Sequence, residues 1–448
     1  MTLPPELARF AKAAIADLVA IPSVAAQGRG VAEAAEAVRA LLTAEGFPAE
    51  LHATAGNPVV YAEGGATAAG APTVLFYNHY DVQPAEPFEE WDSDPFTLDE
   101  RDGALYGRGA ADDKGELVTR LVALRWFQLR NGALPFRVKF VVEGEEEIGS
   151  PSLAGYLKRE RERLEADAVV WEFGAVDAHE RPTTFLGLKG ILALELRLRT
   201  ADRDLHSSYG PVVDNAAWRM AAALASLRDA TGRVLVEGFY DKVVTPPHDV
   251  VAMVDALPAE ESELARLFGL RGYLNGATGR DWLRAVVLAP ALNVNGIGSG
   301  YAGEGAKTVI PAAATAKIDV RLVPDQDPFE VKGLIERHLA RAGFADIEVV
   351  LLQHHEKPVW GPRAHPFVDA ALAALEEVHG VAPAVYPNTP SSGPMHPFVE
   401  QLGAPVVGLG ASYPGGRIHS PNEHVRWRDI EMGSAVIVRA LERYVVGG

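Results

Sequence analysis

Hydrophobic residues are spaced in two ways along the first part of the chain. Apolar positions at helical spacing predict helices from Val31 to Glu45 and from Glu116 to Leu129. Short unbroken apolar runs predict strands buried on both faces, namely TVLFYN from Thr73, FRVKFVVE from Phe136 and DAVVWE from Asp167. Because such strands alternate with helices, the pattern indicates a mostly parallel sheet flanked by helices.

The spacing changes to period two beyond Gly190. Alternate leucines from Leu192 to Leu198, and the apolar positions from Ala316 to Leu322, predict strands with one face in water. Helical stretches at Asn215 to Leu227 and Pro328 to Ala342 accompany these strands. We therefore expect a smaller α+β domain whose helices cover one face of a sheet.

The buried pattern returns from about Pro366, with a helix through Glu377 and an apolar run, APVVGLG, from Ala404. The predicted fold class is thus α/β, with a discontinuous domain of residues 1–188 and 362–448. An inserted α+β domain of residues 189–361 interrupts it.

Composition narrows the possible functions. The 448 residues are 48% hydrophobic and 23% charged, which is typical of a globular chain of two domains. No apolar run approaches the roughly 18–20 residues of a membrane helix, and the N-terminal stretch is typical of an amphipathic helix rather than a signal peptide. A formal charge of −18 without a basic stripe argues against nucleic-acid binding.

The chain has no cysteine, which excludes disulfides, thiolate nucleophiles and Cys-ligated zinc. Any metal ion must therefore be bound by His, Asp and Glu side chains. A cytoplasmic location is the default expectation for such a chain.

Polar side chains follow the predicted buried strands, where the crevice of an open α/β sheet binds ligands. The histidines and carboxylates in these positions and in the loop GRGAADDKGE are His79, Asp81, Asp112, Asp113, Glu145, Glu146, Glu147, Glu172 and His419. Each has a simpler explanation: EGEEE as a solvated loop, Asp112 and Asp113 as helix caps, and HSPNEH as a turn. All of these explanations would have to hold together at the ends of different strands, which is improbable.

Carboxylates gathered at a strand end repel one another unless a cation compensates them. Two histidines with several carboxylates suit two divalent ions that share a carboxylate, with zinc, manganese or cobalt as candidates. Such ions, about 3.5–4 Å apart, bind a water and lower its pKa, while a carboxylate that is not a ligand accepts its proton.

Four strings, HYDVQP, LYGRGAADDKGE, EGEEEIGS and RIHSPNE, occur in an order that resembles one enzyme family. This is the dinuclear zinc peptidase and amidohydrolase family of carnosine-type dipeptidases, aminoacylases, acetylornithine deacetylase, succinyl-diaminopimelate desuccinylase and glutamate carboxypeptidase. The resemblance extends over nearly the whole chain. The segments GLKGILALELRL and KTVIPAAATAKIDVRLVP are most similar to the carnosine-dipeptidase branch.

The resemblance implies two divalent ions per subunit, held by His79, Asp112, Glu147, Glu172 and His419, with Asp112 as the bridging ligand. Asp81 would orient the ring of His79, and Glu146 would be the general base. Asp177 is the alternative to Glu172. The resemblance also implies a cis peptide bond between Asp112 and Asp113. We expect His424, which lies five residues after His419, to be an ordinary surface residue.

In the inserted domain the resemblance points to substrate binding. His206, in DLHSSYGP, would polarise the scissile carbonyl, often in the partner subunit's site. Arg321 would bind the substrate carboxylate bidentately, and Ser392 with Gly393 would form a backbone cradle for the same group. The inserted domain is then a lid through which two subunits form a homodimer.

The expected function is metal-dependent hydrolysis of an amide bond in dipeptides or short peptides, by a metal-bridging water with Glu146 as the base. One alternative is an N-acyl-amino-acid deacylase with the same machinery. Another is a catalytically silent homologue that binds a peptide or a metal. We expect a small peptide as the partner molecule, and neither a nucleic acid nor a membrane.

Overall fold

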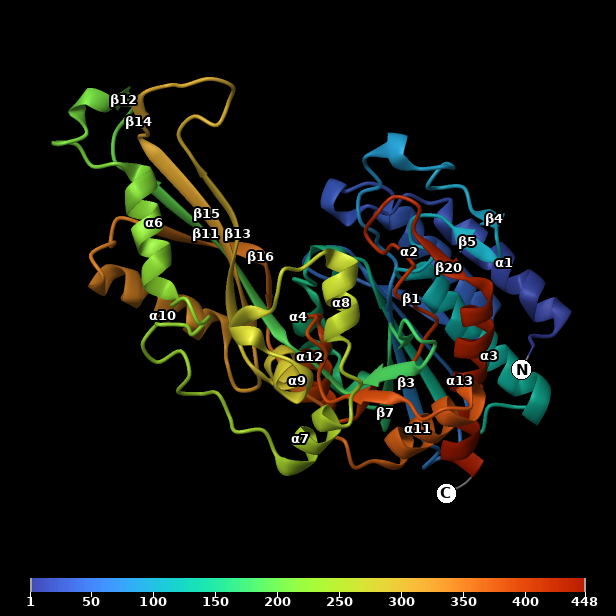
Figure 1. Cartoon of the computed structure of the whole chain (residues 1–448). Coiled ribbons are helices and arrows are strands. Elements are labelled where there is room, and N and C mark those ends of the chain that lie inside the picture. Colours follow the sequence, from blue (N-terminus) through green and yellow to red (C-terminus); the bar gives the residue numbers. More distant parts are fainter. Residues whose placement is uncertain (1, 447–448) are drawn as a thin grey trace. The chain divides into compact units, whose positions relative to one another are not determined.

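The computed structural model describes residues 2–446, which form two compact units (Figure 1). Unit 1 comprises residues 2–187, 360–387 and 394–446. Unit 2 comprises residues 188–359 together with the short segment 388–393. The sequence pattern had placed this short segment with the C-terminal part of the larger domain.

A six-stranded sheet forms the centre of unit 1. Its strands, in spatial order, are β1 (Ala49–His52), β2 (Val59–Gly65), β6 (Arg137–Glu143), β3 (Thr73–His79), β7 (Ala168–Trp171) and β19 (Val406–Gly408). The pairs β6–β3, β3–β7 and β7–β19 are parallel, whereas β1–β2 and β2–β6 are antiparallel. Every residue of β3 is buried, as its unbroken apolar run predicts. The expectation of a mostly parallel sheet is confirmed.

The helices of unit 1 fall into two packed groups. In the first group, α3 packs against α1 and α13, and α13 packs against α11; in the second, α12 packs against α4 and α5. Their bounds are α1 (Pro5–Val19), α2 (Val31–Ala44), α3 (Lys114–Asn131), α4 (Leu153–Arg159), α5 (Arg161–Leu164), α11 (Pro366–His379), α12 (Met395–Leu402) and α13 (Trp427–Val446). Helix α3 ends at Asn131, and the residue that follows, Gly132, has a φ of 85°, which favours glycine.

Two three-stranded sheets complete unit 1. One has the order β20 (His424–Arg426), β5 (Ala104–Tyr106) and β4 (Asp99–Arg101). The other has the order β18 (Ala384–Tyr386), β9 (Pro182–Phe185) and β8 (Ala175–Val176).

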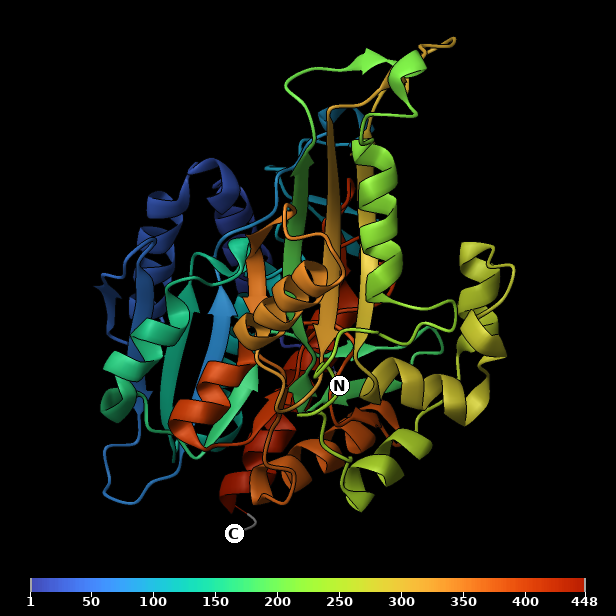
Figure 2. The same ribbon diagram turned by 90° about the vertical axis from the view of Figure 1, so that its left-hand side faces the viewer.

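Unit 2 is built on a four-stranded antiparallel sheet. The strands are β13 (Ala291–Ser299), β15 (Ala313–Leu322), β11 (Gly190–Arg199) and β16 (Glu348–Glu356), in that order. Helices α6 (Ala216–Leu227) and α10 (Pro328–Arg341) cover the same face of this sheet, as Figure 2 shows. Leu192, Leu194 and Leu196 point into the core beneath them, which confirms the period-two pattern.

The rest of unit 2 comprises three short helices and a small two-stranded sheet. The helices are α7 (His248–Asp255), α8 (Glu261–Phe268) and α9 (Gly279–Leu288), and the strands are β12 (Leu205–His206) and β14 (Val309–Ile310).

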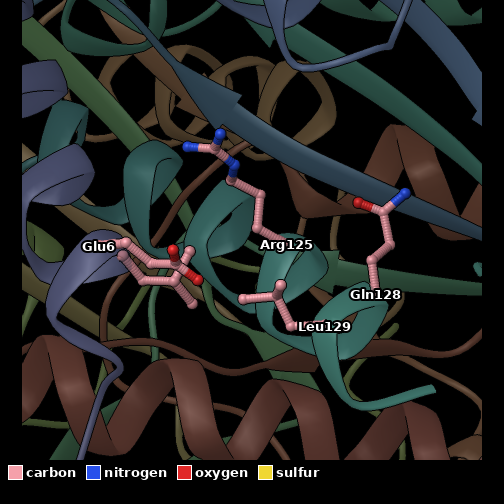
Figure 3. Close-up of a pocket in the computed structure, with 5 residues that line it drawn as sticks. Glu6, Arg125, Gln128 and Leu129 are labelled. Carbon is pink, nitrogen blue, oxygen red and sulfur yellow. The ribbon is translucent and has the colours of Figure 1, made fainter. Parts of the chain in front are cut away.

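A cavity of about 360 Å³ lies between α1 and α3 in unit 1 (Figure 3). Its lining residues are Glu6, Leu7, Arg125, Gln128 and Leu129, none of which was a candidate site residue. Within residues 2–446, no helix combines the length and the hydrophobicity needed to cross a bilayer.

Candidate metal centre

The strands of the central sheet deliver the candidate ligands. His79 is the last residue of β3, and Glu172 follows β7 directly. Glu143 ends β6, and the next turn, η3 (Glu146–Ile148), begins with Glu146 and Glu147. Because β3, β6 and β7 are parallel neighbours, their carboxyl ends lie at one edge of the sheet.

Asp112 lies between two imidazoles. Its Oδ1 is 2.9 Å from Nε2 of His79, and its Oδ2 is 2.9 Å from Nε2 of His419. The same nitrogen of His419 is 3.2 Å from Oε2 of Glu147. Ligand atoms of Asp112, Glu147 and His419 all lie within 4.8 Å of one another. A carboxylate with one oxygen toward each histidine has the geometry of a bridging ligand.

A second group consists of His79, Asp113 and Glu172, whose ligand atoms also lie within 4.8 Å of one another. The Oδ2 of Asp113 accepts hydrogen bonds from Nδ2 of Asn78 at 2.7 Å and from the backbone N–H of His79 at 2.9 Å. Asp113 was among the carboxylates singled out in the loop GRGAADDKGE but was not assigned as a ligand; the expected cis peptide bond between Asp112 and Asp113 is present.

Two buried oxygen atoms in this group, Oε2 of Glu172 and Oδ1 of Asp113, have no hydrogen-bond partner within residues 2–446. Burial, and then the charge of Glu146, raise the pKa of Glu172 well above its usual value. Burial likewise raises the pKa of Asp113 well above its usual value. Buried carboxylates without partners are costly unless a cation or a proton compensates them, so this set of donors fits divalent ions.

Neighbouring carboxylates also shift the pKa values of the two histidines. Burial lowers the pKa of His419, but hydrogen bonds with Asp112 and Glu147 outweigh it and raise the pKa to about 10. The pKa of His79 is raised in the same way, by Asp112 and Asp81 against the effect of burial. Metal ions bind the neutral imidazole, so metal binding would release any proton that these rings hold.

Asp81 connects the histidine with the acidic turn. Its backbone carbonyl lies 3.0 Å from Nδ1 of His79, and its own carboxylate is 3.4 Å from the same nitrogen. The carboxylate also accepts the backbone N–H groups of Glu146 at 3.3 Å and Glu147 at 3.1 Å. Asp81 thus contacts both the ring of His79 and the backbone of the turn that carries both glutamates.

Gln83 holds the side chain of Glu147, a role the sequence did not suggest. Its backbone N–H donates to Oε1 of Glu147 at 3.1 Å, and its side-chain Nε2 donates to Oε2 at 2.9 Å. Nε2 also lies 3.3 Å from the backbone carbonyl of Glu147. Both carboxylate oxygens of Glu147 therefore accept a hydrogen bond from Gln83.

Glu423 organises the loop that presents Asp112. Its fully buried Oε1 accepts the backbone N–H groups of Gly109, Ala111 and Asp112, each at 3.0 Å. Its Oε2 accepts from Arg108 at 2.5 Å. Sequence reasoning had left HSPNEH without this role, although a glutamate inside the motif was the available signal.

Arg120 and Glu116 form a buried ion pair on α3 that ties strand ends together. Arg120 donates to the backbone carbonyls of Trp171, Glu172 and Leu409. Glu116 accepts the backbone N–H of Ala411 at 2.7 Å. The pair fixes the backbone of Glu172, and neither residue was singled out from the sequence.

His419 has a φ of 62°, in the left-handed region that non-glycine residues rarely adopt. Asn422 shares this conformation, with a φ of 62°, and its amide bonds to the backbone N–H of Asp92 and the carbonyl of Glu90. Backbone strain of this kind is typical of functional sites, where the surrounding structure maintains it.

The expectation that His424 lies on the surface is wrong. His424 is buried at the start of β20, and its ring stacks on Tyr106 with centroids 4.3 Å apart. Its Nδ1 lies 2.8 Å from the carbonyl of Asn422. This ring packs within the small sheet rather than facing solvent.

Glu172 and Asp177 have different surroundings. Oδ1 of Asp177 accepts the backbone N–H groups of His179 at 2.8 Å and Arg181 at 2.9 Å, which closes the turn between β8 and β9. Glu172 lies in the second donor group instead. The geometry thus supports Glu172 as the candidate ligand.

The remaining candidates lie in unit 2. Nη1 of Arg321 donates to Oγ of Ser392 at 3.0 Å, and Nε of Arg321 is 3.4 Å from Asp319. Gly393 is buried directly after Ser392. His206 is exposed on β12, where its Nδ1 accepts the backbone N–H of Ser208 at 3.1 Å.

Two solved structures of peptidases have the same fold as this chain. The structure is similar to that of the metallo-carboxypeptidase Sso-CP2 from Sulfolobus solfataricus, with a TM-score of 0.91 and 36% identity, over 97% of this chain and 99% of that one. It is also similar to the di-peptidase Dug1p from Saccharomyces cerevisiae, with a TM-score of 0.84 and 26% identity, over 98% of this chain and 97% of that one.

The sequence is also similar to that of a curated dipeptidase. The Beta-Ala-His dipeptidase of Rattus norvegicus is 30% identical over 371 residues, which cover 80% of this chain and 75% of the relative. Residues 75–443 match the sequence model of one family, which is described as peptidase family M20/M25/M40. The chain therefore belongs to the peptidase family M20/M25/M40.

Proposed function

We propose that this protein is a metallo-dipeptidase that hydrolyses the amide bond of dipeptides or short peptides with two divalent ions bound. The observation that carries the proposal is the position of Asp112, with one oxygen toward His79 and the other toward His419. The names of the yeast and rat relatives support dipeptides as the substrate class. Because the relatives named above are peptidases, the deacylase alternative is not favoured.

His79, Asp112 and Glu172 would hold one ion, and Asp112, Glu147 and His419 the other. Zinc is the first candidate for this set of nitrogen and oxygen donors, and manganese or cobalt would also be accepted. A bound pair of such cations supplies Lewis acidity, which polarises a carbonyl and lowers the pKa of a water molecule. Asp113, through Asn78 and the backbone of His79, would keep the first donor set in place.

Glu146 is the proposed general base. It would accept the proton of the attacking water and donate a proton to the leaving amine. The backbone N–H of Glu146 donates to the carboxylate of Asp81, which would hold the turn that carries the Glu146 side chain. Arg321 and the loop at Ser392 and Gly393 would bind the free carboxylate of the peptide. His206 would help to polarise the scissile carbonyl.

The similarity to a metallo-carboxypeptidase keeps a second candidate function, which is release of the C-terminal residue from longer peptides. The two functions differ in whether the amino end of the substrate must be free. We would assay metal-loaded protein with a free dipeptide, the same dipeptide blocked at its amino end, and an N-acetyl amino acid.

The dipeptidase proposal predicts that the free dipeptide has much the highest kcat/KM of the three. Equal turnover of the blocked dipeptide would favour the carboxypeptidase. Turnover of the N-acetyl amino acid alone would contradict the proposal.

A homodimer formed through unit 2 is part of the proposal. Large apolar side chains are exposed on this unit, with Val212 81%, Trp218 77% and Ile297 65% exposed. Strand β13 forms an edge of the sheet, and exposed apolar groups beside an open strand edge favour association. Light scattering should give twice the chain mass of 47.9 kDa, and Ile297→Lys should shift it toward the monomer.

The role of His206 in the partner's site can be tested with mixed dimers. His206→Ala and Glu146→Gln chains would each be inactive alone, but one site of a mixed dimer would combine the intact groups. Recovery of activity in one of the two sites supports the role in trans, and no recovery argues against it.

A further inference from the structure

Lys189 is a buried cation whose ammonium group lies at the C-terminal end of α9. Its Nζ donates to the backbone carbonyls of Val286 at 2.7 Å and Ala289 at 2.6 Å. Nδ2 of Asn388 donates to the carbonyl between them, that of Val287, at 2.8 Å. The last carbonyls of a helix lack partners within the helix, and a positive charge there also interacts favourably with the helix dipole.

The backbone of Lys189 holds a different segment. Its N–H lies 3.2 Å from the carbonyl of Thr389 and 3.1 Å from that of Ser391, and Leu188 forms a β-bridge with Thr389. Segment 388–393 belongs to unit 2, although its flanking residues belong to unit 1. Lys189 therefore binds this segment through its backbone and α9 through its side chain.

The far end of the segment reaches Arg321. Ser392 accepts a hydrogen bond from Nη1 of Arg321 at 3.0 Å, and Asp319 lies 3.4 Å from Nε of the same guanidinium. Burial, and then the charge of Arg321, lower the pKa of Lys189 to about 8. The charges of Lys189 and Arg321 thus interact, and both residues contact segment 388–393.

We propose that Lys189 is a positioning residue, which anchors segment 388–393 to α9 so that Ser392 and Gly393 meet the substrate carboxylate beside Arg321. Helix α9 then contributes to specificity for peptides with a free C-terminus by holding this segment. This inference rests on the proposed function, because it takes Arg321 as the carboxylate-binding residue.

The test compares a dipeptide with its C-terminal amide, which lacks the carboxylate. We would measure kcat and KM for the wild type, Lys189→Met, Arg321→Met and the control Lys242→Met. Lys242 lies in an exposed ion pair with Glu330 in the same unit. Asn388→Ala is the second variant, because it loosens the same anchor without removing a buried charge.

The wild type should prefer the free acid. Lys189→Met should reduce this preference about 10–100-fold, mainly through a higher KM for the acid, and leave kcat/KM for the amide within about threefold. Asn388→Ala should shift the preference in the same direction, and Lys242→Met should not change it.

Equal losses on both substrates in Lys189→Met and Asn388→Ala would mean a purely structural role and would overturn the inference. An unchanged preference in both variants would also overturn it. If Arg321→Met itself keeps the wild-type preference, the proposed carboxylate site is wrong as well. A result in which Arg321→Met loses the preference while both anchor variants keep it would refute only the inference.

Discussion

Replacing Gln83 with alanine should weaken metal binding while leaving the fold intact. The substitution removes the donor of the 2.9 Å hydrogen bond to Oε2 of Glu147 and its weaker 3.3 Å contact with the Glu147 carbonyl. The backbone N–H of residue 83 would still donate to Oε1 of Glu147. Glu147 would keep one of its two side-chain anchors and gain rotational freedom.

The size of the effect follows from the bond that is lost. A hydrogen bond to a charged group contributes roughly 1.5–3 kcal/mol. At about 1.4 kcal/mol per factor of ten, the ion held by Glu147 should bind roughly 10–150-fold more weakly. The ion held by His79 and Glu172 should bind with much less change, because within residues 2–446 the hydrogen bonds of Gln83 go to Glu147.

Calorimetric titration of the metal-free protein with zinc or manganese would measure both affinities. Gln27→Ala is the matched control, since it removes an exposed contact of the same type, from Gln27 to Glu86 at 3.3 Å. The melting temperature of each variant would identify any loss of folding. Wild-type affinity at both sites in Gln83→Ala would refute the reasoning that Gln83 fixes Glu147.

Three further predictions concern catalysis, pH and packing. Glu146→Gln should bind both ions as the wild type does but lose turnover by orders of magnitude, and unchanged turnover would contradict its role as base. The pKa of Lys189 falls from its usual 10.5 to about 8 on burial, so between these pH values the unfolded chain holds more protons. The free energy of unfolding of the wild type should therefore rise with pH over that window by roughly 3 kcal/mol relative to that of Lys189→Met. Urea unfolding measures this difference, and parallel pH curves for the two proteins would contradict it. By the same measurement, Leu194→Ala in the core of unit 2 should lower the free energy of unfolding by about 2–5 kcal/mol. Leu267→Ala on the surface should lower it by less than about 0.5 kcal/mol, and equal effects would contradict the packing described.

Much of the fold is predictable because its elements have periodic or unbroken apolar patterns. The run TVLFYN became β3, and the alternating leucines from Leu192 to Leu198 became β11. In both cases a local pattern reports the burial of one or both strand faces. The short strands β8 and β9 lack such a pattern, because their burial alternates over only a few residues, and they were not predicted.

Several candidate ligands were visible in the sequence because they end or directly follow buried strands, as His79 and Glu172 do. The residues that hold those ligands were not visible. Glu423 contacts a loop more than 300 positions earlier in the chain, and Arg120 contacts the carbonyl of Leu409, 289 positions away. Such contacts depend on how loops fold against one another, and no spacing rule within one segment encodes them. The burial of His424 was missed for the same reason, since it depends on Tyr106 in a distant strand.

Metal stoichiometry measured on three purified chains tests the central claim most directly. The position of Asp112 between His79 and His419 leads us to expect that the wild type binds two divalent ions per chain and that Asp112→Ala binds neither tightly. Asp177→Ala, which alters only the turn between β8 and β9, should keep both ions. A wild type that takes up no stoichiometric metal, or an Asp112→Ala chain that still binds two ions at wild-type affinity, would contradict the account.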